Sequence, residues 1–406
     1  MKTILEINTT NYGSTGSISL SIAKRARENG YKVYTACKNA IESQKYKYED
    51  QIYIGNRYDR ILSEELAYIT GLRGYFNIYN TYTFLKQVDK IKPDLIHLHV
   101  LHDTFINLNM LFKYINNHHI PVVWTFHDCW SLTGQCPAFE MVGCDKWIKG
   151  CHHCPQTKVV PKSLFLDTTA HIWKKQKKIF TSVGNMTIVT PSEWLKSMVE
   201  KSFFNIYTIQ TIYNGVNLDI FKPEKSDFRE KHNLQNKHVI LGVANIWEER
   251  KGLNTFLWLN KKLPENYQIV LVGTNDEVDK KLPDSIISIH RTYNQKELAQ
   301  IYTAADIFVN PTLEDVFGLV NIEALACGTP VAVYRTGGCS EIITEDSGYV
   351  VERNNKEQLL DCTIKTCEEK PFSEQSCIKR AEYFEINRNF NDYIKLYDRI
   401  LGGNNG

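Results

Sequence analysis

The sequence lacks the features that would place the protein in a membrane or outside the cell. No apolar run in its 406 residues approaches the roughly 20 residues that cross a bilayer. The segment from Met1 to Asn8 has too short an apolar part for a signal peptide and no small-residue cleavage site. Its short apolar run, which ends in polar turn residues, is typical of a buried strand. We therefore expect a cytoplasmic protein.

The sequence also lacks an excess of charge of either sign. The 48 lysine and arginine residues nearly balance the 46 aspartate and glutamate residues, so the formal net charge is only +2. A field this weak gives no reason to expect a nucleic-acid partner. A hydrophobic fraction of 43% and a charged fraction of 23% are those of an ordinary globular protein, and the length predicts two or three domains.

Strands and helices alternate along the chain in two successive series. The strands are apolar throughout, which predicts mostly parallel sheets that are covered on both faces. Turn-forming residues and a proline separate the two series at 213–223, as in an interdomain linker. The sequence therefore predicts two doubly wound α/β domains, at 1–213 and 214–386. Ligands bind such folds at the carboxyl ends of the strands.

The most informative stretch lies between Glu314 and Val331. An apolar strand ending at Asn310 leads into an acidic loop with Gly318, and Glu323 follows in a helix that Gly328 terminates. Carboxylates accept paired hydrogen bonds from the vicinal hydroxyls of a sugar, and backbone N–H groups at the start of a helix bind anions. This combination predicts a site for a polyol that carries phosphate.

The same stretch resembles the donor-binding signature of the retaining glycosyltransferases of family four, which are also grouped as glycosyl transferases group 1. Their pattern has two Glu residues separated by seven others, with Phe-Gly between them and Ala-Cys-Gly-x-Pro after the second. The second Glu matches Glu323, and the first aligns with Asp315, which leaves Asp315 or Glu314 as the first carboxylate. Phe317, Gly318 and Leu319 match the centre of the pattern.

The resemblance implies a GT-B fold, in which two Rossmann-like domains face a central cleft. It implies that 1–213 forms the acceptor side, that 214–386 binds the nucleotide-sugar, and that a terminal helix at 387–401 packs back on the first domain. Glu323 would bind the ribose hydroxyls, and Asp315 or Glu314 would bind the sugar hydroxyls. The reaction implied is a retaining, hexosyltransferase-type transfer.

Two further segments are candidates for binding the diphosphate. Glycines after the first strand can bring backbone N–H groups against a phosphate, and Gly16 matches the family's glycine-rich loop. Arg250 and Lys251 precede a predicted helix, where paired cations would stabilise a departing diphosphate. The family's arginine position is Asn245 here, so we expect Arg250 to replace it and Lys251 to be retained.

Histidines follow two strands of the first domain. His127 comes directly after an apolar strand and matches the family histidine that contacts the donor sugar or its phosphate, which makes it a candidate catalytic residue. His97, His99 and His102 cluster after an earlier strand. They are either acceptor-side groups or polar lining.

The eleven cysteines are unevenly distributed, and five of them lie between Cys129 and Cys154. Without a secretion signal they are expected to be thiols or metal ligands rather than disulfides. A loop over 127–166 needs something to hold it, and four thiolates around a structural zinc ion would do so. The candidate ligands are Cys136, Cys144, Cys151 and Cys154; free thiols are the alternative, and disulfides come third.

A lysine-rich helix contains Lys174, Lys175, Lys177 and Lys178. It is either a solvated face or a surface that rests on anionic lipid at the inner face of the plasma membrane, as in family members with lipid-linked acceptors. Gly337 and Gly338, with Glu341, resemble a further element that lines the donor pocket.

Together these features predict transfer of a sugar from a UDP- or GDP-sugar to a hydroxyl of a glycan or lipid-linked intermediate of bacterial surface polysaccharide synthesis. No cofactor is expected for transfer, because no isolated Asp-x-Asp follows a plausible strand and protein cations take the place of a metal ion. Two rivals remain. One is a nucleotide-sugar epimerase of the same fold, and the other is a non-catalytic sugar-binding module built on the cysteine loop.

Overall fold

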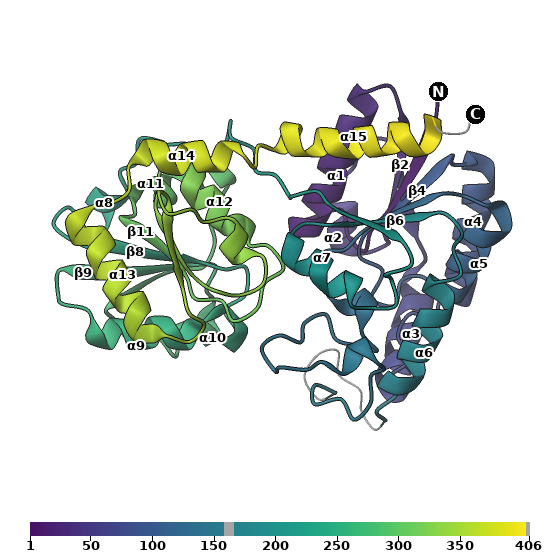
Figure 1. Ribbon diagram of the computed structural model, residues 1–406, viewed down its shortest axis with the longest axis horizontal. Coiled ribbons are helices and arrows are strands. Elements are labelled where there is room, and N and C mark those ends of the chain that lie inside the picture. The colour runs from purple at the N-terminus through teal and green to yellow at the C-terminus, as the bar shows by residue number, and fades with distance from the viewer. Residues whose placement is uncertain (158–165, 403–406) are drawn as a thin grey trace. The chain divides into compact units, whose positions relative to one another are not determined.

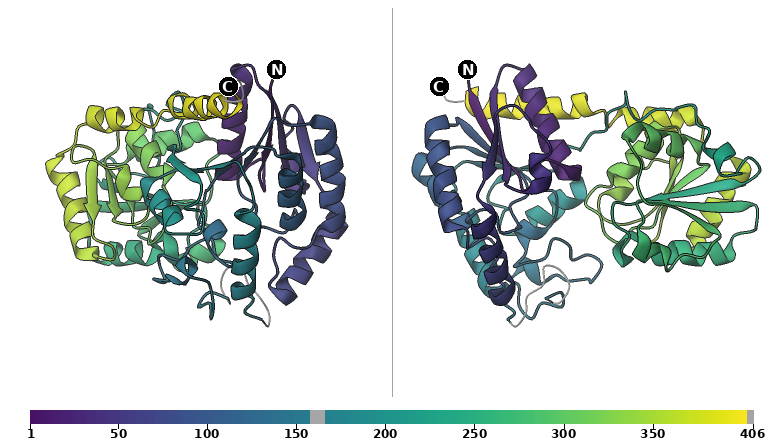
Figure 2. Two further views of the ribbon diagram at one scale, coloured as in Figure 1. Left: turned by 45° about the vertical axis from the view of Figure 1, so that its right-hand side comes forward. Right: turned by 180° about the vertical axis from the view of Figure 1, so that it is seen from behind.

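The computed structural model describes residues 1–157 and 166–402. Part of the predicted cysteine-rich loop, at 158–165, and the chain end at 403–406 lie outside the described residues. The chain divides into two compact units: a first unit of Met1–Tyr213 with Phe390–Gly406, and a second unit of Asn214–Asn389. In Figures 1 and 2, each unit is a sheet covered by helices.

The first unit contains a seven-stranded sheet in which all neighbouring strands are parallel, in the order β3-β2-β1-β4-β5-β6-β7. The order reverses between β1 and β4, which is where ligands bind in doubly wound folds. The strands are β1 (Thr3–Ile7), β2 (Lys32–Lys38), β3 (Gln51–Ile54), β4 (Leu95–Leu98), β5 (Val122–Thr125), β6 (Met186–Thr190) and β7 (Thr208–Thr211).

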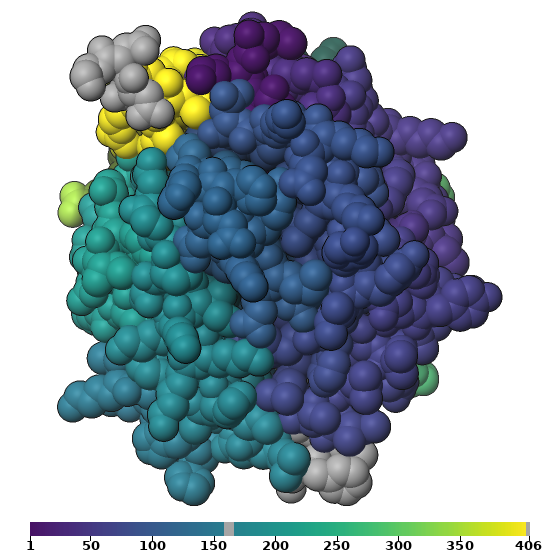
Figure 3. Space-filling view, turned by 90° about the vertical axis from the view of Figure 1, so that its right-hand side faces the viewer, coloured from purple at the N-terminus to yellow at the C-terminus, as the bar shows by residue number. Residues whose placement is uncertain are grey.

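Helices cover both faces of this sheet (Figure 2). In the space-filling view of Figure 3, segments of this unit coloured purple to teal form a continuous surface. The helices are α1 (Gly13–Glu28), α2 (Ile41–Gln44), α3 (Arg57–Thr70), α4 (Ile78–Ile91), α5 (Leu108–His118), α6 (Thr169–Phe180), α7 (Glu193–Glu200) and most of α15 (Ile386–Gly402). Trp124 of β5 anchors the core, with ring centroids 5.6 Å from Phe112 and 4.9 Å from Phe180. Contacts of this kind join the sheet to α5 and α6.

The second unit contains a six-stranded sheet with the order β10-β9-β8-β11-β12-β13, and its paired strands are also parallel. Its order reverses between β8 and β11. The strands are β8 (His238–Val243), β9 (Tyr267–Val272), β10 (Ile286–Ile289), β11 (Ile307–Asn310), β12 (Val331–Tyr334) and β13 (Gly348–Val351). The helices are α8 (Phe228–Lys231), α9 (Leu253–Lys262), α10 (Asp276–Asp279), α11 (Gln295–Ala304), α12 (Leu319–Ala326), α13 (Lys356–Glu369) and α14 (Glu374–Glu382).

Helix α1 begins at Gly13, so Gly16 lies within its first turn. Asn294 caps α11, because its side chain accepts a hydrogen bond from the Glu297 amide at 2.9 Å, and the Glu297 carboxylate accepts one from the Tyr293 amide at 2.5 Å. Within residues 1–157 and 166–402, no helix has the length and apolarity to cross a membrane.

Candidate functional site

Two loops meet where the strand order of the second unit reverses. The loop after β8 contains Arg250, Lys251 and Gly252, and the loop after β11 runs to α12. The Leu313 amide donates to the Arg250 carbonyl at 2.8 Å. Gly252 has a φ of +79°, and a Cβ there would lie 2.3 Å from the Pro311 carbonyl oxygen, so only glycine permits this approach. The contact holds the predicted cationic and acidic residues together.

An ion pair links these two loops. The ammonium group of Lys251 lies 2.6 Å from Oδ2 of Asp315, and an Arg250 guanidinium nitrogen donates to the Glu314 carbonyl at 3.1 Å. Burial raises the pKa of Asp315, but the charge and hydrogen bond of Lys251 lower it more, so the net pKa lies below its usual value. Asp315 is therefore ionised at neutral pH.

The two candidates for the first carboxylate lie in different environments. Glu314 is buried, with 5% of its surface exposed, whereas the partly exposed Asp315 side chain is the one that contacts Lys251. A Cβ on Gly337 would lie 1.7 Å from the Asp315 carbonyl oxygen, and the Gly338 amide donates to that oxygen at 3.2 Å. The loop after β12 thus supports the backbone of Asp315.

Helix α12 starts beside this pair. Gly318, at its N-terminal cap, has a φ of +87°, and Leu319 is the first helical residue. Phe317 is buried, and its amide lies 3.4 Å from Oδ1 of Asp315. The start of α12 thus follows Asp315 within a few residues of the chain, and the start of a helix is a place where backbone N–H groups can bind an anion.

Glu323 lies one turn further along α12. Its Oε2 accepts a hydrogen bond from the hydroxyl of Tyr302, on α11, at 3.0 Å. Burial raises the pKa of Glu323 to about 7, although the Tyr302 hydrogen bond lowers it. A carboxyl group that titrates near neutral pH and retains acceptor capacity can bind sugar hydroxyls.

In the first unit, Gly16 lies in the first turns of α1 rather than in a loop before it. A Cβ on Gly16 would lie 2.8 Å from the carbonyl carbon of Asn11. The chain between β1 and α1 is thus folded tightly against the helix start, which only a residue without a side chain allows.

Histidines line the carboxyl ends of β4 and β5. Nδ1 of His99 lies 3.0 Å from Nε2 of His127, within hydrogen-bonding distance. His102 lies 2.9 Å from the carboxylate of Asp128. Burial lowers the pKa of His99 and of His127 to about 3, so both imidazoles are neutral at physiological pH. His97 lies in the core, 2.6 Å from the Tyr397 hydroxyl and 2.8 Å from the Thr125 hydroxyl.

The structure adds Glu6, which sequence analysis does not single out. It lies on β1 with 1% of its surface exposed, and its Oε2 accepts from the Ser19 hydroxyl at 2.9 Å. The same oxygen lies 3.6 Å from Nε2 of His99. Burial raises the pKa of Glu6 to about 8. Its only sequence signal is one acidic residue within an apolar strand.

The four predicted zinc ligands line one small pocket together with Trp147 and His152. Two of their sulfurs accept backbone hydrogen bonds. The Gly134 amide donates to Cys151 at 3.1 Å, and the Gln156 amide donates to Cys154 at 3.4 Å. Cys129 is not among the residues that line this pocket.

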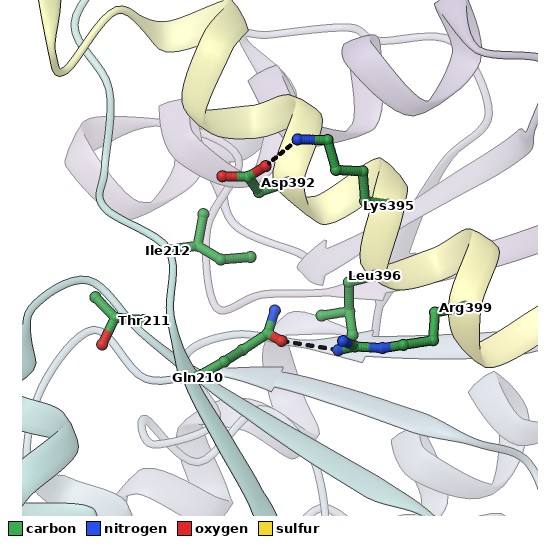
Figure 4. A pocket seen from close by; sticks show the side chains of 7 residues that line it. All are labelled: Gln210, Thr211, Ile212, Asp392, Lys395, Leu396 and Arg399. Atoms are coloured by element: carbon green, nitrogen blue, oxygen red, sulfur yellow. Dashed lines mark hydrogen bonds and ion pairs between the residues drawn. The ribbon is translucent and has the colours of Figure 1, made fainter.

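A second hollow of the first unit lies between β7 and α15 (Figure 4). Lys395 pairs with Asp392 at 2.7 Å, and Arg399 donates to Gln210 at 2.8 Å. The hollow contains none of the predicted site residues. Its cationic side chains already have partners, and we assign it no role.

Comparison with known proteins identifies the family. The model of Glycosyltransferase Family 4 matches residues 17–220, and that of Glycosyl transferases group 1 matches residues 224–383. The chain belongs to glycosyltransferase family 4, and the family resemblance is confirmed.

Relatives and solved structures agree with this assignment. WcaC of Escherichia coli (strain K12), whose name provisionally describes a colanic acid biosynthesis glycosyl transferase, is 23% identical over 86% of each chain. The O-antigen chain mannosyltransferase RfbU of Salmonella typhimurium is 29% identical over 52% of this chain and 55% of its own.

Among solved structures, sucrose-phosphate synthase from Thermosynechococcus elongatus has a TM-score of 0.73 at 17% identity, covering 99% of this chain and 100% of that one. HepE from Anabaena in complex with UDP has a TM-score of 0.69 at 15% identity, covering 98% and 100%. The predicted GT-B class with two Rossmann-like domains is confirmed.

The hydrogen bond between Tyr302 and Glu323 generates a prediction. In Tyr302→Phe, loss of this donor removes about 1.4 kcal/mol of stabilisation from the carboxylate, so the pKa of Glu323 rises by about one unit. The ¹³C shift of the carboxyl carbon, assigned with Glu323→Gln, reports this pKa. Tyr349→Phe is the matched control, because Tyr349 packs on Phe372 instead. If the pKa of Glu323 is the same in Tyr302→Phe as in the wild type, the Tyr302 hydroxyl does not stabilise this carboxylate.

The same group predicts how stability depends on pH. The native state keeps the Glu323 proton up to about pH 7, whereas the unfolded chain loses it near the ordinary glutamate pKa of 4.5. The contribution of Glu323 to the free energy of unfolding therefore falls as the pH rises through this window. Urea denaturation measures the free energy of unfolding at each pH. In Glu323→Gln, this free energy should not show the fall that Glu323 causes in the wild type.

Proposed function

We propose that the protein transfers a hexose from a UDP- or GDP-sugar to a hydroxyl group of a glycan or lipid-linked acceptor, with retention of configuration at the anomeric carbon. The bond from the anomeric carbon to the diphosphate oxygen breaks, and a bond to the acceptor oxygen forms. The acceptor's proton leaves with the diphosphate or to solvent. The observation that carries this proposal is the convergence of Lys251, Asp315 and the start of α12 at the point where the strand order reverses.

Each residue has a role that follows from its chemistry. Glu323 accepts hydrogen bonds from the ribose hydroxyls, and Asp315 accepts them from the sugar hydroxyls, with Glu314 as the alternative. Arg250 and Lys251 neutralise the charge that develops on the departing diphosphate. Lys251 and Asp315 form an ion pair with each other. When the donor binds, Asp315 accepts a hydrogen bond from a sugar hydroxyl and Lys251 contacts a phosphate, and these contacts replace part of the ion pair.

The helix starts supply the remaining contacts with the donor. Phosphate oxygens bind to backbone N–H groups at two helix starts. One set lies near Gly318 and Leu319, directly after Phe317, and the other lies near Gly16. His127 contacts the donor sugar or its phosphate, as the family resemblance implies. Protein cations and N–H groups thus serve where other transferases use a divalent ion, so we propose a metal-independent transfer.

The relatives favour a particular substrate class. WcaC and RfbU are named for colanic acid and O-antigen synthesis, and HepE is solved with UDP and with UDP-glucose. We therefore favour a UDP-sugar as donor and an intermediate of bacterial surface polysaccharide synthesis as acceptor, with the reaction in the cytoplasm.

Incubation with a panel of nucleotide-sugars tests the proposal. One donor should release its nucleoside diphosphate, faster when a hydroxyl acceptor is added, and EDTA added at the start of the assay should leave the initial rate unchanged. A coupled assay for UDP or GDP measures the release. Strict dependence on magnesium would contradict the proposed site.

Variants of Glu323 separate the proposal from its rivals. Loss of charge-assisted hydrogen bonds to ribose in Glu323→Gln should lower kcat/KM by about 10- to 100-fold. An epimerase would convert the donor without an acceptor and without release of diphosphate. A binding module would release nothing, and Glu323→Ala would bind sugar as the wild type does. Glu368→Gln, on α13, is the control.

We further propose that Cys136, Cys144, Cys151 and Cys154 bind a structural zinc ion that shapes the acceptor side. All four line one pocket, and backbone N–H groups directed at Cys151 and Cys154 suit thiolate sulfurs. Burial raises the pKa of Cys151 to about 11, so a metal ion is needed to hold it as thiolate at neutral pH. The ion would stabilise a loop whose described residues contain no strand, and it would take no part in transfer.

Metal analysis tests the zinc site. The purified protein should contain about one zinc ion per chain, and Cys136→Ser and Cys154→Ser should lose it and unfold at a lower temperature. Cys362→Ser, on α13 of the second unit, should keep it. Four thiols that react readily in the native protein, together with no stabilisation by added zinc, would contradict the site.

We also propose that the first unit rests on an anionic membrane surface. Lys174, Lys177 and Lys178 of α6 are exposed, and Lys175 lies 3.8 Å from the ring of Tyr75, in the segment between α3 and α4. Helices α3 and α4 of the same unit expose large apolar side chains, with exposed fractions of 59% for Leu62 and 63% for Ile78. Exposed cations together with exposed apolar groups suit a lipid interface.

Vesicle flotation measures this contact. The protein should float with vesicles that contain phosphatidylglycerol and not with phosphatidylcholine alone, and salt should weaken the binding. Leu62→Ser with Ile78→Ser, or Lys174→Glu with Lys178→Glu, should reduce it. Tyr293→Ser, which removes a 95% exposed ring from the second unit, is the control. Equal flotation of all variants would refute the surface.

A further inference from the structure

A line of buried side chains in the first unit leads from the centre of the sheet to His127. It starts at Glu6 on β1, passes through His99 after β4 and ends at His127 after β5. Oε2 of Glu6 lies 3.6 Å from Nε2 of His99, and Nδ1 of His99 lies 3.0 Å from Nε2 of His127. Each member thus faces the next through one defined atom.

Two atoms of this line have no hydrogen-bond partner among the described residues. They are Oε1 of Glu6 and Nε2 of His99. A buried polar atom without a partner has lost its hydrogen bonds to water without replacement, which destabilises the folded state. Because 3.6 Å is slightly too long for a direct hydrogen bond, a shift of a few tenths of an ångström between Glu6 and His99 would satisfy His99. The two side chains are therefore poised to bond to each other.

We propose that Glu6 and His99 are positioning residues that determine which ring nitrogen of His127 carries its proton. This inference rests on the proposed role of His127 in transfer. It concerns the direction of hydrogen bonds along the line, because a neutral imidazole has one N–H donor and one acceptor nitrogen.

The direction follows from the state of Glu6. A protonated Glu6 donates to Nε2 of His99, so His99 keeps its proton on Nδ1 and donates it to Nε2 of His127. His127 then carries its own proton on Nδ1 and offers a donor to the substrate. If Glu6 is ionised, every bond in the line reverses, and Nδ1 of His127 becomes an acceptor.

The surroundings of Glu6 favour the protonated state at neutral pH. The polar groups that face it are Ser19 and Arg27 from α1, His97 of β4 with His99 just after that strand, and Tyr393 and Tyr397 from α15. Arg27 lowers the pKa of Glu6, but burial raises it more, to about 8. The neutral phenols and imidazoles do not offset the burial. Above this pH the line should reverse.

The protonation of His127 can be read without any assay of transfer. Nitrogen-15 spectra of histidine-labelled full-length protein, assigned with His127→Gln, distinguish the Nδ1–H form from the Nε2–H form. We expect the Nδ1–H form in the wild type at pH 7 and a change to the Nε2–H form above about pH 8. Glu6→Gln, which remains a neutral donor, should keep the Nδ1–H form throughout, and Glu6→Leu should lose the preference.

A second pair of variants keeps the inference testable if Glu6→Leu fails to fold. The amide nitrogen of His99→Asn can replace Nδ1 as a donor and should preserve the Nδ1–H form, whereas His99→Leu should not. Tyr114→Phe, whose lost hydroxyl bonds Asp89 at 2.8 Å instead, is the control. A wild-type Nε2–H form at pH 7, or equal spectra for Glu6→Gln and Glu6→Leu, would overturn the proposal.

Turnover gives the functional consequence. Glu6→Leu and His99→Leu should lower kcat by about tenfold, less than the ~100-fold typical of losing an acid–base group itself, with little change in the donor KM. Glu6→Gln should match the wild type at pH 7 and exceed it at pH 9. Full activity of His127→Ala would remove His127 from the proposed function, and the spectra would still decide whether Glu6 and His99 set its protonation.

Discussion

A backbone contact between two loops of the second unit is the constraint on which the candidate donor site depends. The loops after β8 and β11 join through the Leu313 amide and the Arg250 carbonyl, and Gly252 allows them to approach. Main-chain atoms make this contact. The side chains of Lys251 and Asp315 are therefore not needed to hold the two loops together. Their mutual attraction can then be exchanged for contacts to a charged ligand.

The two candidate sites differ in the charges they hold. In the second unit, the charge of Lys251 keeps Asp315 ionised, so the two loops offer charges of both signs. In the first unit, burial lowers the pKa of His99 and of His127 and raises the pKa of Glu6, so all three groups are neutral at pH 7. A neutral imidazole has one donor and one acceptor nitrogen, so these histidines can present either to a neighbouring group, which a fixed charge cannot do.

The sequence predicts the two parallel sheets because their strands are apolar throughout and alternate with helices. It misses β3 and α3, since Gln51–Ile54 is short and α3 leaves large apolar residues such as Tyr58 85% exposed, which blurs the periodicity. Asp315 and Glu323 follow from a local motif. The contact of His97 with Tyr397, 300 positions away, and the burial of Glu6 depend on tertiary packing that no local pattern records.

Helix α15 completes the first unit from the far end of the chain. Its Tyr397 hydroxyl lies 2.6 Å from Nδ1 of His97 and its Tyr393 hydroxyl lies 3.1 Å from the Thr125 hydroxyl, so it covers His97 and Thr125 with polar groups that match them. The helix starts beside the linker at 213–223. There the Val216 amide donates to the Phe384 carbonyl, and the Ile386 amide donates to the Val216 carbonyl. A substitution at Gly215, where a Cβ would lie 2.4 Å from the Ile386 Cα, would therefore disturb both chain connections between the units at once.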